Sequence, residues 1–161
     1  MKKCDQCQRF ALNIHQPGGV LNPLSNPWPF AQWGLDIVGS FPKVAGNKRY
    51  LLVGTDYFTK RVEAEPLVNI KDVDVKRFIW KNIVTQFEIP HTLISNNGLQ
   101  FDSKAFRRYY YDLGIKNRYS TPTYPQGNGQ AEAVNKIIVS GLKKRLVDAK
   151  GKWVEELSHV L

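Results

Sequence analysis

The spacing of apolar residues changes near residue 70, and this change restricts the possible folds more than any other feature of the chain. Before it, three runs have strand character and are bounded by turn residues. They are WGLDIVGSF, RYLLVGTDYF and RVEAEPLV, at residues 33–41, 49–58 and 61–68. After it, apolar residues recur at every fourth position from Val75 to Phe87, which predicts a helix with one buried face.

The rest of the chain alternates between further strands and helices. The pattern predicts a strand at 91–95, a helix at 103–113, a strand at 115–120, a helix at 130–149 and another from 153. Asp102 or Ser103 can cap the first of these helices, and Gly114 closes it. Three hairpin-linked strands followed by crossovers predict an α/β fold, with a mixed five-stranded central sheet and helices on its faces.

Residues 1–30 differ in composition from the rest. They are rich in proline and glycine and show no periodicity, so we predict a tail and linker there, and one folded domain over residues 31–161. A fraction of 42% hydrophobic residues and four tryptophans agree with a globular domain.

The charge balance favours a polyanionic partner. Twenty-three Lys and Arg residues against fourteen Asp and Glu give a net charge of +9, and such an excess is typical of proteins that bind nucleic acid. A basic surface with no specific partner is the alternative. No apolar run reaches the ~18–20 residues that a membrane-spanning helix needs.

The only cysteines, Cys4 and Cys7, form a C-x-x-C pair. A structural zinc site needs four ligands, and no histidine precedes Cys4. The pair is therefore interpreted as a remnant of a zinc site, and zinc binding is not expected.

Three polar positions can meet on a mixed sheet: Asp36, Asn96 and Glu132. Asp36 interrupts an apolar strand, where a carboxylate is costly unless it is paired or binds a metal. It could instead lie at a sheet edge or strand end, facing water. Asn96 ends a short strand ahead of an Asn97-Gly98 turn. Glu132 lies in the first turn of the long helix, where the helix dipole alone would favour it.

The sequence of the long helix also predicts which of its faces is buried. Its apolar stripe is expected at Val134, Ile138, Leu142 and Leu146. Lys136 and Lys143 lie near the direction of Glu132 and away from that stripe. A carboxylate followed by two cations suits a phosphate backbone beside a metal site, although an ion pair between Glu132 and Lys136 would explain part of the pattern.

Four segments are distinctive, and they are WGLDIVGSFP, DYFTKRVEAEPL, IPHTLISNNGLQFDS and YPQGNGQAEAVNK. Together, and in this order, they resemble the catalytic core of retroviral-type integrases, and most resemble those of plant gypsy-class LTR retrotransposons. The resemblance covers essentially all of residues 4–161. It extends to CDQCQRF, which is similar to the last two ligands of the family's zinc domain.

The resemblance implies an RNase H-like fold and DNA strand transfer by three acidic residues that bind two Mg²⁺ or Mn²⁺ ions. Asp36 matches the first acid and Glu132 the third, whereas the second falls on Asn96. It also implies DNA as partner, a homo-oligomer, a nuclear location, and a core domain truncated at its C-terminal end.

An amide at position 96 predicts impaired catalysis. Asparagine offers one neutral oxygen, whereas Mg²⁺ prefers anionic oxygens. Weaker metal binding would slow strand transfer by roughly 10²–10⁴-fold. Asp102, six residues on, and Asp56, within a strand, are interpreted as structural.

Two other functions remain open. A non-enzymatic module would bind nucleic acid or self-associate through basic residues of the last helices and a neighbouring loop. These residues are Lys136, Lys143, Lys144, Arg145, Lys150 and Lys152, with Tyr124, Gln126 and Asn128 in the loop. An RNase H-type nuclease needs a further carboxylate on the first long helix, and Asp72 and Asp74 lie only at its start.

Overall fold

The computed structural model describes residues 28–96, 101–120 and 129–161. Its strands are β1 (Gln32–Gly39), β2 (Tyr50–Asp56), β3 (Val62–Leu67), β4 (Thr92–Asn96) and β5 (Lys116–Ser120). Its main helices are α2 (Asp72–Phe78), the π-helical η2 (Ile79–Val84), α3 (Thr85–Phe87), α4 (Lys104–Leu113), α5 (Gly129–Asp148) and α6 (Trp153–Val160). Two single 3₁₀ turns, η1 (Ala45–Asn47) and η4 (Lys150–Lys152), lie between them.

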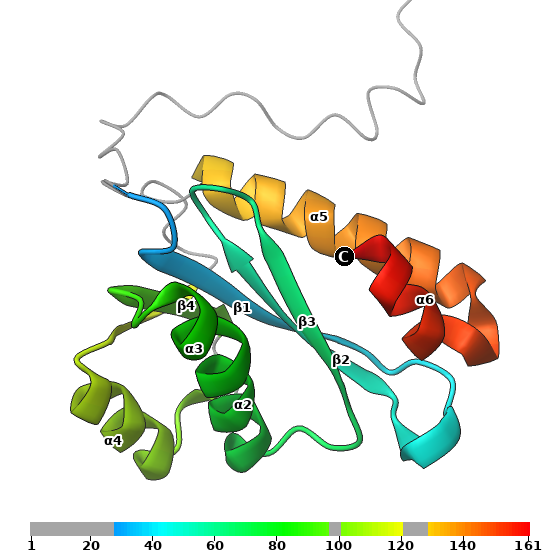
Figure 1. The fold of residues 1–161 in the computed structure, drawn as a ribbon, viewed down its shortest axis with the longest axis horizontal. Helices are drawn as coiled ribbons and strands as arrows, with labels where there is room; N and C mark the ends of the chain where they lie inside the picture. Colours follow the sequence, from blue (N-terminus) through cyan, green and yellow to red (C-terminus); the bar gives the residue numbers. More distant parts are fainter. Residues whose placement is uncertain (1–27, 97–100, 121–128) are drawn as a thin grey trace, which may run out of the picture.

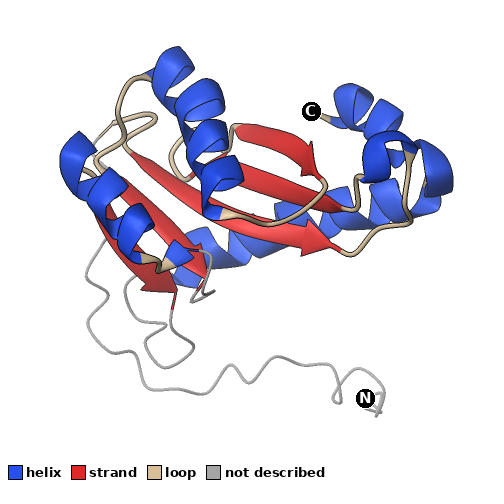
Figure 2. Ribbon diagram, turned by 90° about the horizontal axis from the view of Figure 1, so that it is seen from below, coloured by secondary structure: helices blue, strands red, loops and turns tan. Residues whose placement is uncertain are grey.

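The strands form one mixed sheet in the order β3-β2-β1-β4-β5. The first three strands form an antiparallel meander, and β4 and β5 add to it in parallel. This arrangement confirms the predicted mixed five-stranded sheet. Helices cover both of its faces, with α5 and α6 on one and α2 to α4 on the other (Figures 1 and 2).

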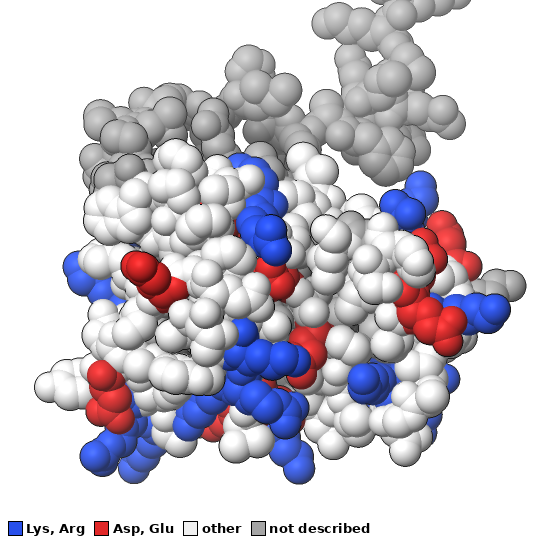
Figure 3. All heavy atoms as spheres, viewed as in Figure 1, with Lys and Arg blue, Asp and Glu red and all other residues white. Residues whose placement is uncertain are grey.

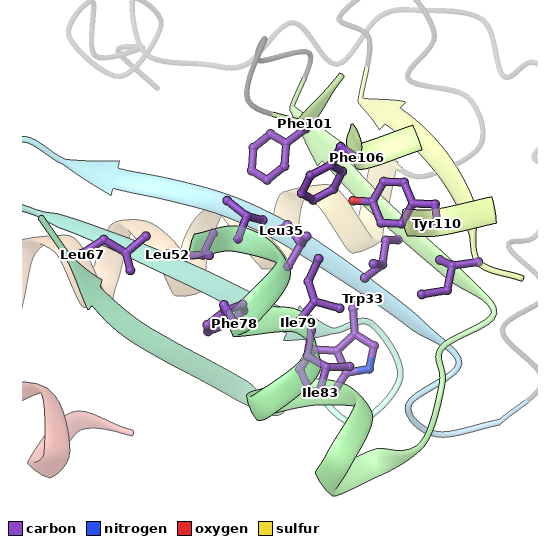
Figure 4. Packing of buried hydrophobic residues seen from close by; sticks show 13 residues of the cluster. Trp33, Leu35, Leu52, Leu67, Phe78, Ile79, Ile83, Phe101, Phe106 and Tyr110 are labelled. Carbon is purple, nitrogen blue, oxygen red and sulfur yellow. The ribbon is translucent and has the colours of Figure 1, made fainter. Parts of the chain in front are cut away.

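Successive side chains of a strand point to opposite faces of the sheet. The apolar residues on one face of the strands therefore form a core with α2 to α4. Trp33, Leu35 and Leu52 are at most 3% exposed and pack with Phe78 and Ile83 of the helical segment (Figure 4). The helix predicted between Val75 and Phe87 is one continuous helical stretch with a π-helical turn at its centre.

Helix α4 has the predicted caps. The Ser103 hydroxyl accepts a hydrogen bond from the Phe106 amide at 3.1 Å, and Gly114 adopts the left-handed conformation that ends many helices. Ser103 rather than Asp102 is therefore the N-cap. Asp102 has a different role, in a hydrogen-bond network with Arg107 and Tyr119.

The core on the other face joins α5 and α6 to the meander. Val139, Leu142 and Leu146 of α5 pack with Val38, Val53 and Trp153. The predicted stripe was correct at Leu142 and Leu146, but the structure buries Val139 where Ile138 was expected. An α-helix has 3.6 residues per turn, so residues chosen at every fourth position move gradually around the helix and away from one face. A buried stripe therefore combines spacings of three and four, as from Val139 to Leu142 to Leu146.

Trp153 anchors α6 to the loop after β1. Its side chain is fully buried and stacks on Phe41 at 4.7 Å between ring centroids, and its Nε1 donates to the Pro42 carbonyl at 3.0 Å. We expect Trp153→Phe to lower the free energy of unfolding by about 1–2 kcal/mol, because it leaves a small cavity and removes this hydrogen bond. Urea denaturation measures the change. Trp80→Phe is the control, because Trp80 is 52% exposed, and an equal loss in both variants would contradict the anchoring role.

No helix in the described part of the chain is long and apolar enough to cross a membrane.

Candidate active site

Asp36 lies on the central strand of the sheet. The register pairs it with Val53 of β2, whose side chain belongs to the core under α5, so Asp36 is on the α5 face. It is half-buried, and its Oδ1 accepts a hydrogen bond from the Ile37 amide at 2.8 Å. A sheet-edge position is therefore wrong, because β1 has strands on both sides. Asp36 does lie just past the last pair between β1 and β4, so the strand-end form of the alternative is partly correct.

Asp36 and Asn96 directly follow the last pair between β1 and β4. Leu35 of β1 pairs with Ser95 of parallel β4, so the next residues along the two strands are Asp36 and Asn96. Asn96 is also the last residue of β4 and pairs with Ser120 of β5. Two positions separated by sixty residues thus become neighbours at the point where β4 ends.

Helix α5 runs across the same face of the sheet (Figure 1). The helix begins at Gly129, and Glu132 lies in its first turn. The side chains of Asn96 and Glu132 lie outside the described part of the structure.

The carboxylates on other elements have structural partners. Asp56 is fully buried and accepts hydrogen bonds from the amides of Phe30 and Thr59 and from the Thr59 hydroxyl. Asp72 accepts from the Ser103 hydroxyl, and Asp74 pairs with Arg77 at 3.0 Å. Asp56 therefore has the structural role predicted for it, and the acids on α2 are engaged locally.

The donor set fits a divalent ion only in part. Asp36 supplies a carboxylate, whereas position 96 supplies an amide with no charge. Among the described side chains, no three His, Cys, Asp or Glu residues lie close enough to hold a metal ion. Glu132, the other acid predicted for the site, is not among them, because its side chain lies outside the described part of the structure.

The residues predicted to bind DNA fall into two groups. Lys136, Lys143 and Lys144 are exposed on α5, as a phosphate contact requires. The loop residues Tyr124, Gln126 and Asn128 and the cysteine pair Cys4 and Cys7 lie outside the described residues.

Sequence reasoning missed cations on other elements. Arg118 of β5 is exposed and pairs in register with Ile94, which pairs with Gly34, so it lies on the α5 face of the sheet. Lys71, Arg77 and Lys81 line a groove beside β3, where Glu65 and Asp74 partly neutralise them. Figure 3 shows cations and acids mixed on this side of the molecule. The alternation of β5 could have identified Arg118, whereas the groove depends on how α2 packs.

Comparison with known proteins agrees with this arrangement. Residues 27–125 match the Integrase core domain family. The chain is 35% identical over 134 residues to the Gag-Pol polyprotein of Koala retrovirus, a match that covers 83% of this chain and 8% of the polyprotein. It is 24% identical over 162 residues to the Transposon Tf2-3 polyprotein of Schizosaccharomyces pombe (strain 972 / ATCC 24843), which covers 99% of this chain and 12% of that protein.

A solved structure shares the fold. The intasome of simian T-cell lymphotropic virus, determined in complex with PP2A regulatory subunit B56 gamma, superposes with a TM-score of 0.61 at 21% identity. The superposition covers 90% of this chain and 50% of that one. At this identity the likeness supports the RNase H-like fold of an integrase core. Together with the match over residues 27–125, it places the chain by its sequence and its fold: the protein belongs to the integrase core domain family.

Proposed function

We propose that this chain is the catalytic core of an LTR-retroelement integrase, built for DNA strand transfer and impaired by the amide at position 96. The observation that carries the proposal is the register that sets Asn96 beside Asp36 on the face crossed by α5. In the proposed site, Asp36 and Glu132 are two of three metal-binding positions, and Asn96 occupies the third. Calorimetric titration of the Asn96→Asp variant with Mn²⁺ tests this assignment.

The proposed chemistry depends on charge. Divalent ions at such a site would activate the attacking oxygen and stabilise the leaving one. Asp36 is fixed for this purpose by its place on the central strand and by the bond from the Ile37 amide. With asparagine at position 96, two carboxylates remain to offset the charge of the ions, so metal binding and catalysis are weakened together.

Features of the sequence and the matches support a finer assignment. The four motif segments favour a plant gypsy-class retrotransposon, and similarity over nearly the whole chain to a yeast retrotransposon polyprotein is compatible with it. A homo-oligomer is proposed because the relative of similar fold is part of an intasome. A nuclear location is proposed from the resemblance to the integrase family.

The exposed lysines of α5 are proposed to hold the phosphate backbone. Replacing Lys136, Lys143 and Lys144 together with glutamine should weaken binding to duplex DNA. It should also reduce the slope of log K against log salt by about 0.9 for each lysine that contacts a phosphate. Fluorescence anisotropy at several salt concentrations measures both quantities.

The matched control replaces cations on the opposite face. Lys104 and Arg108 of α4 are exposed and lie on the α2–α4 side of the sheet. Changing them to glutamine should leave the slope unchanged. Equal effects of the two sets of variants would mean that DNA contacts the chain through its overall charge rather than through α5.

A non-enzymatic module that binds nucleic acid is the second candidate. The amide at position 96 favours it, because DNA binding through α5 needs no metal. In that case DNA affinity should be the same with Mg²⁺ and with a chelator, and Glu132→Gln should not change it.

A further inference from the structure

Three side chains form a hydrogen-bond network next to the end of β4 and β5. The Tyr119 hydroxyl donates to Asp102 Oδ1 at 2.6 Å. The Arg107 guanidinium binds the same carboxylate with two bonds, Nε to Oδ1 and Nη2 to Oδ2, both at 2.9 Å. A bidentate contact of this kind has a fixed geometry, since the planar donor pair matches the two carboxylate oxygens.

The ionisation of these groups agrees with the geometry. The bond from Arg107 and then that from Tyr119 hold the pKa of the Asp102 carboxyl below its usual value. Burial, followed by the bond to Asp102, raises the pKa of the Tyr119 phenol. The network therefore keeps a carboxylate, a guanidinium and a neutral phenol through the neutral pH range.

The residues around Asp102 are fixed to the body of the protein. Phe101, which precedes it, is 1% exposed and packs in the core against Phe106. Ser103, which follows it, caps α4 and donates to Asp72 of α2. The backbone at Asp102 is thus held in place on both sides, so its side chain can fix the position of Tyr119.

Through Tyr119, Asp102 holds the end of the paired strands β4 and β5. Tyr119 pairs with Ser95, and the next pair, Ser120 with Asn96, is the last of the two strands. Terminal pairs of a ladder open more readily than internal ones, because they have a neighbour on one side only. The bond from Tyr119 to Asp102 attaches the strand one residue before that last pair.

We propose that Asp102, Arg107 and Tyr119 act as a positioning clamp that keeps the last β4–β5 pair closed and so fixes position 96 beside Asp36. The proposal deepens the function proposed for this site and rests on it for its effect on metal binding. Its effect on the strand ladder is independent of that function. Asp102 and Arg107 both reach solvent, so the clamp acts locally and contributes little to global stability.

The test compares Tyr119→Phe with Tyr111→Phe, which removes the hydroxyl of a tyrosine that is 85% exposed. The first measurement is hydrogen exchange of the backbone amides of β4 and β5 by NMR. Tyr119→Phe should speed exchange at the last pairs about 5–10-fold with little change in melting temperature, while Tyr111→Phe should change neither. Asp102→Asn is a second variant that should give the same local acceleration, because it removes the bidentate contact to Arg107.

The second measurement is Mn²⁺ affinity in the Asn96→Asp background. Adding Tyr119→Phe should weaken binding about tenfold, because the backbone at position 96 would then have to be ordered when the ion binds. Unchanged exchange in both Tyr119→Phe and Asp102→Asn would overturn the clamp. Faster exchange with unchanged affinity in a background that binds Mn²⁺ would overturn its role in positioning. If the Asn96→Asp chain binds no Mn²⁺ at all, the proposed metal site is wrong, and exchange alone then decides the clamp.

Discussion

Replacing Asn96 with aspartate is expected to create a divalent-metal site and to raise strand-transfer activity by about 10²–10⁴-fold. The backbone at position 96 already lies beside Asp36, so the substitution adds a charge without requiring a new arrangement of the strands. The side chains of aspartate and asparagine have nearly the same size, so the fold should not change. Calorimetry with Mn²⁺ and a gel assay for joining of DNA ends measure the two effects.

Two controls test whether the effect of Asn96→Asp depends on where the new carboxylate is placed. Asn69→Asp makes the same chemical change at an exposed residue between β3 and α2, and it should create no metal affinity. Adding Asp36→Asn to the Asn96→Asp chain should abolish the new site, since one carboxylate of the pair is removed. Metal binding by the parent chain as tight as by the Asn96→Asp variant would show that the amide does not impair the site.

Replacing Asp56 with alanine is expected to lower the free energy of unfolding by about 3–5 kcal/mol. The carboxylate is fully buried at the end of β2. One oxygen accepts from the Phe30 amide at 3.1 Å, and the other accepts from the Thr59 amide and hydroxyl, both at 2.7 Å. Alanine leaves these donors without an acceptor, and the segment before β1 is no longer attached to the β2–β3 turn. Urea denaturation followed by circular dichroism measures the loss.

Two further variants are compared with Asp56→Ala. Asp56→Asn should also destabilise the protein, because its NH₂ group would face a donor on one side. Asp112→Ala should change the free energy of unfolding by less than about 0.5 kcal/mol. The Asp112 side chain is 61% exposed, and its ion pair with Arg108 is long, at 3.9 Å. A loss below 1 kcal/mol for Asp56→Ala would mean that water replaces the carboxylate as the acceptor.

The elements of this fold could be predicted because each has a local signal. Alternation and turn residues identify β1 to β3, and a period close to 3.6 identifies α2 to α3 and α5. Ser103 and Gly114 mark the ends of α4 by their own backbone chemistry. The mixed sheet follows from the order of these elements, since parallel strands require crossovers.

Tertiary packing determined the features that lack a local signal. The helical period requires a spacing of three somewhere in the buried stripe of α5, and packing on the sheet decides that it falls between Val139 and Leu142. Asp102 bonds to Tyr119, seventeen residues away, and no spacing rule predicts that contact.

The candidate site divides in the same way. The sequence by itself predicted which residues form it, because Asp36, Asn96 and Glu132 lie within motifs typical of the family, and it determined that residue 96 carries no charge. Only the tertiary structure decided that Asp36 and Asn96 are neighbours, because the register of two parallel strands brings together residues that are far apart in the chain. Strand register depends on pairing and core packing across the whole sheet, which no single segment of sequence specifies.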